Sequence, residues 1–437
     1  MMELTGKCFS VLGLARTGVA AANYLARHGA DVVASDSKTE DHLPLEDLDK
    51  RVFVRAGENF VRAGDTVIIS PGIKPGSPTW HLAHDRGSEV ISDIELFYRL
   101  CPCPIIAITG TDGKSTTTSL IGKLLEAAGK KVFVGGNIGL GCMNGLEELG
   151  PEDIAVLEVS CFQLTHCPTF RPATAVLTNI AEDHVEYHGS TAAYIAAKQQ
   201  VYANLGPGDV IVANGDDPEI SRWAYPTGVT VRRFGWREGL DCWADRLETH
   251  LPGGIIQPHQ GLKLKGLHNI ENVMAAALAT AEHFPAVLGA LQSYAGLEHR
   301  MEYVATINGV EYYNDTKATN PHATTAVVNA FRDEPFWLLA GGHDKGSDFT
   351  ELGALIAART RGALLYGQTR TRLASSIPAG ACVETMETLA EAVSRAHQLA
   401  VPGEKVILAP ACSSFDQFTD FEQRGRIFKE LVRALAQ

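Results

Sequence analysis

The chain has 437 residues, of which 45% are hydrophobic and 20% are charged, and its formal net charge at pH 7 is −13. These values are typical of a globular protein, and the length suits two to four domains at roughly 150 residues each. The negative charge argues against a nucleic-acid binder or a protein of anionic membrane surfaces, because both need a basic surface.

The sequence shows no signal-peptide pattern and no apolar run that would span a bilayer, so we expect a cytoplasmic protein without membrane insertion. Its nine cysteines include no Cys-X-X-Cys pair. Cys101 and Cys103 flank a proline just before a predicted strand. We expect reduced thiols without a metal.

The first segment has the pattern of a βαβ unit. Residues 8–12 predict a strand that leads through Gly13 and Gly18 into a helix, and the next strand ends at Asp36. An acidic residue about twenty positions past the glycines is typical of a ribose contact. Ala15 stands where the usual fingerprint has its second glycine. A simple tight turn between strand and helix therefore remains an alternative.

A further strand at 66–70 is followed directly by Pro71 and Gly72. Ligands of open parallel sheets sit at strand ends, so Ser70 and Gly72 are candidates for the same crevice. The first domain is expected to close near Ser92.

The second segment contains a candidate phosphate loop. Residues 104–108 predict a buried strand, 109–113 a glycine turn, and the chain from Lys114 a helix. Backbone N–H groups at such a turn bind an anion, and the lysine adds a mobile charge. The hydroxyl of Ser115 or Thr116 is suited to Mg²⁺. The usual pattern has glycine in place of Ile108, so an ordinary glycine turn is the alternative.

Polar residues follow the next predicted strands, at 131–134, 154–159 and 173–178. Because parallel strands end at one sheet edge, we expect these residues to converge there. Glu158 lies inside an apolar strand, where a carboxylate is costly unless it is paired or binds a metal. The polar residues that follow these strands are Asn137, Ser160, Gln163, Asn179, Glu182, Asp183 and His184.

Lys198 lies in a helix predicted at 192–202, and by itself it has the pattern of a solvated lysine. A β-rich stretch at 210–264 precedes an alanine-rich helix predicted at 273–281. Asn269 and Asn272 are three residues apart and would share one helical face, with a capping role for Asn269 as the alternative.

The last segment again alternates strands and helices. A hairpin is predicted around Asn308-Gly309, and further strands at 336–340, 363–366 and 405–408. Polar residues follow the hairpin and the last strand, and the final predicted helix contains Arg424. The chain is thus predicted to form three α/β domains.

These motifs resemble one family, the Mur ligases, which are ATP-dependent amino-acid-adding enzymes of bacterial cell-wall synthesis. The resemblance covers nearly the whole chain. The motifs that carry the resemblance are residues 110–116, 157–163, Asn179 with 182–184, 196–198, 268–272, His299-Arg300, 314–320, 410–418 and 421–425. The last two blocks are similar to those of the D-glutamate-adding branch.

The resemblance implies an α/β fold of three domains. They are a Rossmann-like UDP-binding domain at 1–92, a P-loop ATPase-like domain at 93–296 and a Rossmann-like domain at 297–437. It also implies a monomer. The implied substrates are ATP, UDP-N-acetylmuramoyl-L-alanine and D-glutamate. ATP would convert the alanyl carboxylate into an acyl phosphate, which the amine of D-glutamate attacks. Closure of the C-terminal domain would exclude water.

The resemblance also assigns roles to residues. The implied catalytic residues are Lys114, Glu158, His184, Lys198 and Lys317. Two Mg²⁺ ions would be held by Ser115, Glu158, His184 and Lys198, the last carrying a carbamate derived from CO₂. ATP contacts would come from Gly110, Thr111, Asp112, Gly113, Lys114, Ser115, Thr116, Asn272, Arg300, Asp315 and Lys317. The UDP-sugar substrate would meet Leu14, Thr17, Asp36, Ser37, Gly72, Asn137, Ser160, Gln163 and His184. D-Glutamate would meet Thr319, Lys345, Ser414 and Phe421.

Two positions depart from the family's pattern. Asp112 stands where asparagine is more usual, and a carboxylate repels phosphate unless it faces away. His343-Asp344 precedes Lys345 in a variable part of the glutamate pocket.

Three other functions remain as alternatives. A folylpolyglutamate synthase-like ligase lacks the first domain and the 410–418 block. A nicotinamide-dependent oxidoreductase would give no role to Lys114, Lys198 and Lys317. A non-catalytic nucleotide-binding regulator leaves the lysines and Glu158 unexplained.

Overall fold

The computed structural model describes residues 3–85, 88–138, 141–264, 266–331, 334–343 and 346–436. It divides into two compact units, Met1–Tyr294 and Ala295–Gln437. The first unit contains two sheets and the second contains one. The predicted domain limits at 92/93 and 296/297 remain predictions. In the described part of the chain, no helix combines the length and the apolar character needed to cross a membrane.

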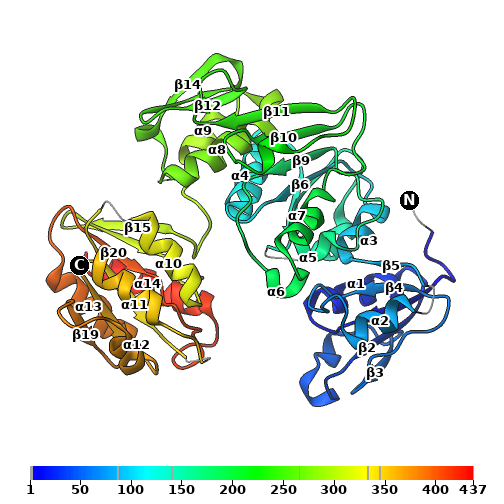
Figure 1. The fold of residues 1–437 in the computed structure, drawn as a ribbon, viewed down its shortest axis with the longest axis horizontal. Coiled ribbons are helices and arrows are strands. Elements are labelled where there is room, and N and C mark those ends of the chain that lie inside the picture. Colours follow the sequence, from blue (N-terminus) through cyan, green and yellow to red (C-terminus); the bar gives the residue numbers. More distant parts are fainter. Residues whose placement is uncertain are drawn as a thin grey trace. The chain divides into compact units, whose positions relative to one another are not determined.

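The first sheet is parallel, with the strand order β3-β2-β1-β4-β5 (Figure 1, blue). The order reverses on either side of β1, so the loops after β1 and β4 flank the crevice where ligands of such sheets bind. The strands are β1 Cys8–Leu12, β2 Asp31–Asp36, β3 Phe53–Ala56, β4 Thr66–Ile69 and β5 Val90–Ile91. The helices are α1 Arg16–Arg27, α2 Pro78–His84 and α3 Asp93–Leu100.

The second sheet has nine strands in the order β14-β13-β12-β11-β10-β9-β6-β8-β7. Strand β6 lies between β8 and β9, and all three run parallel, so their following loops meet at one edge. The strands are β6 Ile105–Thr109, β7 Val132–Gly136, β8 Ile154–Glu158, β9 Thr174–Leu177, β10 Val210–Asn214, β11 Thr230–Gly235, β12 Cys242–Ala244, β13 Glu248–Leu251 and β14 Ile255–Pro258. The helices are α4 Lys114–Ala127, α5 Cys161–Leu164, α6 Val185–His188, α7 Thr191–Gln199, α8 Leu267–Ala279 and α9 Leu288–Ser293.

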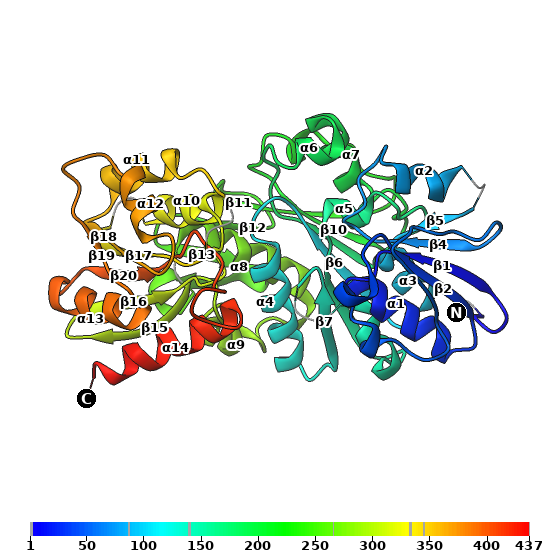
Figure 2. The ribbon, with the colours of Figure 1, turned by 90° about the horizontal axis from the view of Figure 1, so that it is seen from below.

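Alternation along β6 divides the core between the two faces of this sheet. Ile106 and Ile108 join a core with α4 and α8, which pack against each other (Figure 2). Ile105 and Ala107 point to the other face and share one continuous core with α3 and the first sheet, including Phe9. This shared apolar core holds the two sheets together in one unit.

The sheet of the second unit has the order β15-β16-β20-β17-β18-β19. The predicted hairpin is confirmed: β15 and β16 pair antiparallel, with Asn308 and Gly309 at φ 51° and 79°. The strands are β15 Glu302–Ile307, β16 Val310–Asn314, β17 Phe336–Gly341, β18 Gly362–Tyr366, β19 Val383–Thr385 and β20 Lys405–Leu408. The helices are α10 Pro321–Ala330, α11 Thr350–Arg359, α12 Arg370–Ser376, α13 Leu389–Leu399 and α14 Phe421–Ala434.

The predicted strands around the candidate loops are confirmed, with ends shifted by one or two residues. The alanine-rich helix was placed too late, because α8 already begins at Leu267, after Gly266 at φ 98°. Three short strands, β3, β5 and β19, were not predicted. All three are edge or near-edge strands with few buried positions.

Candidate active site

The loop between β6 and α4 has two positions that exclude a side chain. Gly110 has φ 153°, and a Cβ there would lie 1.9 Å from Thr178 Oγ1. Gly113 has φ 79°, and a Cβ there would lie 2.3 Å from Asn272 Oδ1. The loop is therefore enclosed by the end of β9 on one side and by α8 on the other.

Hydrogen bonds from β9 hold the loop backbone. Asn179 Nδ2 and Thr178 Oγ1 donate to the Asp112 carbonyl at 3.1 and 2.7 Å, and the Asp112 N–H donates to Asn179 Oδ1 at 2.8 Å. The Thr111 N–H donates to the Asn179 carbonyl at 2.9 Å. Asp112 itself is exposed. The loop is thus preformed by backbone contacts that do not involve the Asp112 carboxylate.

Lys114, the first residue of α4, folds back over this loop. Its Nζ donates to the carbonyls of Gly110 and Thr111 at 3.0 and 2.7 Å. Ser115 and Thr116 are buried in the first turn of the helix. A glycine loop, a helix N-terminus and a lysine together make a cradle for phosphate. The alternative of an ordinary glycine turn does not account for the lysine that closes over it.

Asn272 links α8 to α4. Its Oδ1 accepts from Thr117 Oγ1 at 3.2 Å, and its Nδ2 donates to Asn269 Oδ1 at 2.9 Å. Both asparagines are buried, at 5% exposure. The alternative that Asn269 caps the helix is wrong, because the N-cap is Gly266 and no side chain makes the cap bond.

Glu158 ends β8, beside β6, and its side chain is 3% exposed. Its Oε1 accepts from Asn137 Nδ2 at 2.8 Å. Its Oε2 is buried without a hydrogen-bond partner. A buried carboxylate oxygen without a partner is costly, and a divalent cation would satisfy it. Within the described ranges, no group of three or more His, Cys, Asp or Glu side chains is arranged for a metal.

Lys198 is 2% exposed, so the alternative of a solvated lysine is wrong. Its Nζ donates to the Gly110 carbonyl and lies 4.8 Å from the centre of the Tyr194 ring. Burial, followed by the nearby charge of Lys114, lowers the pKa of Lys198 to about 7. The structure thus brings Lys114 and Lys198 to the same backbone carbonyl.

His184 precedes α6 with a positive φ of 53°. Its Nε2 lies 3.3 Å from Asp183 Oδ2, and its ring packs on Phe162 at a centroid distance of 4.6 Å. Within α6, the Tyr187 hydroxyl donates to the Ile73 carbonyl at 3.0 Å, in the loop that contains Gly72. The short helix that follows His184 thus contacts the loop after β4 of the first sheet.

Ser160 and Gln163 form a capping box at the start of α5. The Gln163 amide also donates to both carboxylate oxygens of Asp93, at 3.0 and 3.2 Å. Asp93 is buried, which raises its pKa. The side chains of Ser160 and Gln163 therefore stabilise the start of α5, and Gln163 links it to Asp93.

Asp36 closes the first βα turn. Its carboxylate accepts from the backbone N–H groups of Leu14 and Lys38 at 2.8 and 2.9 Å. Thr17 is partly exposed, Ser37 is exposed, and nothing lies within 4 Å of a Cβ built on Gly72. Asp36 therefore stabilises the turns after β1 and β2, beside the crevice of the sheet.

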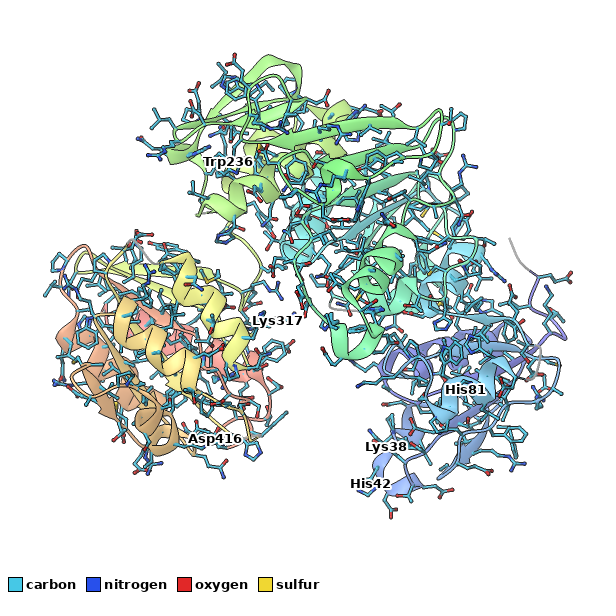
Figure 3. All side chains as sticks on the ribbon, in the orientation of Figure 1. Lys38, His42, His81, Trp236, Lys317 and Asp416 are labelled. Carbon is cyan, nitrogen blue, oxygen red and sulfur yellow. The ribbon has the colours of Figure 1, made fainter. Side chains whose placement is uncertain are left out.

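In the second unit, the loop from Asp315 to Asn320 follows β16. Asp315 is 7% exposed, and burial raises its pKa to about 6 against the opposing effects of Arg300 and Lys317. Lys317, labelled in Figure 3, is exposed, and its Nζ lies 5.9 Å from the centre of the Phe421 ring.

Arg424 holds this loop, a role that sequence reasoning missed. It is fully buried in α14 and donates to Thr316 Oγ1 at 2.9 Å and to the Thr316 carbonyl at 3.0 Å. It also donates to the carbonyls of Cys412 and Ser413 at 3.1 and 3.2 Å. The loops after β16 and β20 are thus joined by one guanidinium.

Of the residues predicted for D-glutamate, Thr319 and Ser414 lie on these loops and Phe421 is the first residue of α14. Thr319 is partly exposed and its N–H donates to the Lys317 carbonyl at 2.8 Å, while Ser414 is 2% exposed. Lys345 and the preceding Asp344 lie outside the described residues.

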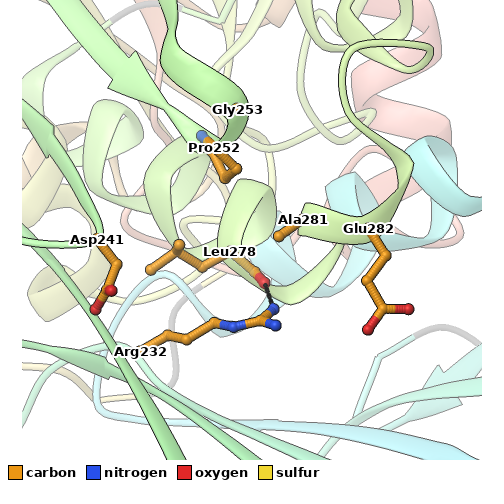
Figure 4. A pocket seen from close by; sticks show the side chains of 7 residues that line it. All are labelled: Arg232, Asp241, Pro252, Gly253, Leu278, Ala281 and Glu282. Carbon is orange, nitrogen blue, oxygen red and sulfur yellow. Dashed lines mark hydrogen bonds between the residues drawn. The ribbon is translucent and has the colours of Figure 1, made fainter.

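A separate cavity of about 350 Å³ lies at the C-terminal end of α8 (Figure 4). Arg232 Nη1 donates there to the Leu278 carbonyl at 3.1 Å. The lining residues are Arg232, Asp241, Pro252, Gly253, Leu278, Ala281 and Glu282, and they include none of the predicted site residues.

Family models match each part of the chain. The Mur ligase MurD-like N-terminal domain matches residues 7–92, the Mur ligase middle domain 108–280, and the Mur ligase glutamate ligase domain 299–412. The chain is similar to two solved structures. One is the ligase MurC from Thermotoga maritima, with a TM-score of 0.57, 19% identity, and coverage of 98% of this chain and 99% of that one. The other is MurF from the same organism in complex with ADP, with a TM-score of 0.58, 16% identity, and coverage of 98% and 96%. At such identities the likeness concerns the fold.

Two curated relatives are similar over their full length. The UDP-N-acetylmuramoylalanine–D-glutamate ligase of Koribacter versatilis is 39% identical over 451 residues, covering 100% of this chain and 99% of the relative. The ligase of the same name from Geobacter metallireducens is 40% identical over 456 residues, covering 99% of both. The predicted three-domain α/β architecture is confirmed, and the chain belongs to the Mur ligase family.

Proposed function

We propose that this chain ligates D-glutamate to UDP-N-acetylmuramoyl-L-alanine at the expense of ATP, giving ADP and phosphate, in peptidoglycan synthesis. The observation that supports this proposal most directly is the preformed loop from Gly110 to Lys114. Both Lys114 and the buried Lys198 donate hydrogen bonds to the Gly110 carbonyl. The names of the full-length relatives support the choice of substrates. Family membership removes the support for a nicotinamide-dependent oxidoreductase.

The reaction needs activation because a carboxylate would have to expel oxide. Transfer of the γ-phosphoryl group to the alanyl carboxylate releases ADP and makes an acyl phosphate. The neutral amine of D-glutamate then adds to the acyl carbon, loses a proton, and phosphate leaves as the amide forms. Three anions must meet, so positioned cations and N–H donors carry most of the catalysis.

In the first unit, we assign the phosphate cradle to the loop. Lys114 would exchange its two carbonyl partners for the β- and γ-phosphates, and the backbone from Gly110 to Gly113 would donate N–H groups. Asn272 of α8 lies against Gly113 and would contact the nucleotide. Because Asp112 is exposed and its backbone is anchored by Asn179, its carboxylate need not face the phosphates.

The donor set suits Mg²⁺. Glu158 offers an unpartnered buried oxygen, and we assign further ligands of two Mg²⁺ ions to Ser115, His184 and Lys198. When bound, the metal neutralises the charge that develops on the transferred phosphoryl group.

Lys198 would join this set as a carbamate. Only the neutral amine adds to CO₂, and a pKa lowered to about 7 leaves a large neutral fraction near physiological pH. Carbamylation turns a cation beside Lys114 into an anion with two oxygen ligands, which relieves the repulsion between the two lysines.

The remaining substrate contacts are assigned by unit. In the first unit, Leu14, Thr17, Asp36, Ser37 and Gly72 would meet the uridine diphosphate, and Asn137, Ser160, Gln163 and His184 the muramoyl-alanine part. In the second unit, Arg300, Asp315 and Lys317 would contact ATP, and Thr319, Lys345, Ser414 and Phe421 the D-glutamate. We further infer a cytoplasmic monomer.

The test is phosphate release from ATP with UDP-N-acetylmuramoyl-L-alanine and each amino acid in turn. We expect release that depends on D-glutamate and on the UDP-sugar. L-Glutamate and D-aspartate are the matched controls for handedness and chain length. Phosphate release with a different amino acid only would change the assigned amino-acid substrate but keep the ligase reaction. Release with no amino acid at all would overturn the proposed reaction.

A further inference from the structure

Cys101 and Cys103 form a thiol pair in the segment that joins α3 to β6. Their Sγ atoms lie 3.5 Å apart, at hydrogen-bond distance, and Cys101 Sγ lies 3.5 Å from the Cys103 carbonyl oxygen. The proposed reaction gives neither thiol a role. Disulfide formation would bring the sulfurs closer by about 1.5 Å, since an S–S bond is about 2.05 Å long.

The two thiols differ in accessibility. Cys101 is partly exposed, whereas Cys103 is buried at 8% exposure. Their mutual hydrogen bond lowers the pKa of Cys101 and, together with burial, raises the pKa of Cys103. Cys101 therefore has the character of an attacking thiolate and Cys103 that of a resolving thiol.

From this pairing we propose that Cys101 and Cys103 are a reversible dithiol–disulfide modification site that reacts with small-molecule disulfides. The Cys101 thiolate attacks one sulfur of the small disulfide, forming a mixed disulfide and releasing one thiolate. Cys103 then loses its proton to water, and its thiolate attacks the Cys101 sulfur, forms the internal disulfide and releases the second small thiolate, which takes up a proton from water. Two protein thiols are oxidised and one small disulfide is reduced to two thiols.

The position of the pair favours the second step. An intramolecular thiol at this distance acts at an effective concentration far above that of a dissolved thiol. A ring closed over three residues is also strained, which makes such a disulfide easy to reduce again. Both properties describe a reversible site and not a structural cross-link.

The chain provides its own controls for the test. Cys8 and Cys382 are exposed. After trypsin digestion, each lies alone in its peptide, 8–16 and 373–395, while peptide 100–114 contains both Cys101 and Cys103. The folded protein is equilibrated with mixtures of reduced and oxidised glutathione, quenched in acid, unfolded, alkylated and digested.

We expect peptide 100–114 to lose two hydrogen atoms and to resist alkylation. This should occur in mixtures no more oxidising than those that half-modify Cys8, because the second attacking thiol is intramolecular. Cys8 and Cys382 should carry single glutathione adducts instead. Full double alkylation of peptide 100–114 under conditions that modify Cys8, or a lasting glutathione adduct on Cys101, would overturn the proposal.

Single variants identify the order of attack. Cys103→Ser should accumulate the glutathione adduct on Cys101, and Cys101→Ser should leave Cys103 reduced. The wild-type measurement stands by itself if either variant fails to fold. An equal adduct yield on Cys103 in Cys101→Ser would contradict the assignment of Cys101 as the attacking thiol.

Discussion

The amide oxygen of Asn272 occupies the space that a side chain on Gly113 would need, 2.3 Å from the position of a Cβ. The two residues belong to different helices, since Gly113 caps α4 and Asn272 lies in α8. The contact explains why the phosphate loop has glycine at this position, and it leads to the first prediction.

Gly113→Ala should weaken ATP binding at least about tenfold, about 1.4 kcal/mol, because the new methyl group must displace Asn272. Isothermal titration with a non-hydrolysable ATP analogue measures this. Gly129→Ala is the matched control, since Gly129 also has φ 79° but has nothing within 4 Å of its Cβ position. It should show the strain of the left-handed backbone, about 1 kcal/mol of stability, with unchanged ATP affinity. Equal affinity losses would refute the contact argument.

Glu158→Gln should raise the Mg²⁺ concentration for half-maximal activity about tenfold or more, because it removes the charge from the unpartnered oxygen. Its thermal stability should not fall, since a buried charge is lost. Glu95→Gln is the control, and we expect it to change stability but not the Mg²⁺ dependence. Glu95 is fully buried and bonds Arg99 at 2.8 Å, so this variant should lose about 2–3 kcal/mol of stability with unchanged Mg²⁺ dependence. Magnesium titrations and thermal melts of both variants decide the matter.

Lys198→Ala should lower activity by about a hundredfold or more, and a small carboxylate such as acetate should restore part of it. A ¹³C NMR signal from labelled CO₂ should be present in the wild type and absent in the variant. Lys123→Ala, at an exposed position of α4, should leave both readouts unchanged. Wild-type activity in Lys198→Ala would remove the proposed role.

His166 should give the protein an acid-sensitive stability. Burial and the neighbouring His84 lower its pKa to about 4, below the ordinary value of 6.5. The unfolded chain therefore binds the proton more readily. The contribution of His166 to the free energy of unfolding, about 2–3 kcal/mol, is fully present above about pH 6.5. It is lost as the pH falls toward 4. Urea unfolding of His166→Asn should show a flatter dependence in this window, whereas His42→Asn, at an exposed site, should keep the wild-type slope.

Arg424→Met should loosen the loop from Asp315 to Asn320, because four hydrogen bonds to two loops disappear. We expect hydrogen exchange of the Lys317 amide to accelerate at least about tenfold. Arg433→Met, nearer the end of the same helix and exposed, is the control. Unchanged exchange in Arg424→Met would show that the loop is held by other contacts.

The sequence allowed the strands that carry the site to be predicted, because β6 and β8 are short apolar runs that end in Thr109 and Glu158. Strand β20 is likewise a short, mostly apolar run, and Ser413 and Ser414 follow within six residues of its end. It did not reveal β3, whose four residues include none that is buried. Asn179 was noted at a strand end, but its bond to Asp112 joins residues 67 positions apart, and no local pattern reports such a contact. Arg424 was placed in a helix, while its burial depends on loops far away in the sequence.

That distance has a consequence for how the protein is made. Thr316 precedes Arg424 by 108 residues, so the ribosome produces the loop after β16 long before the side chain that anchors it. Until α14 is synthesised and docks, this loop lacks the four hydrogen bonds of Arg424. In a nascent chain, the loop from Asp315 to Asn320 therefore reaches its final geometry late in translation, whatever the order in which the preceding strands pair.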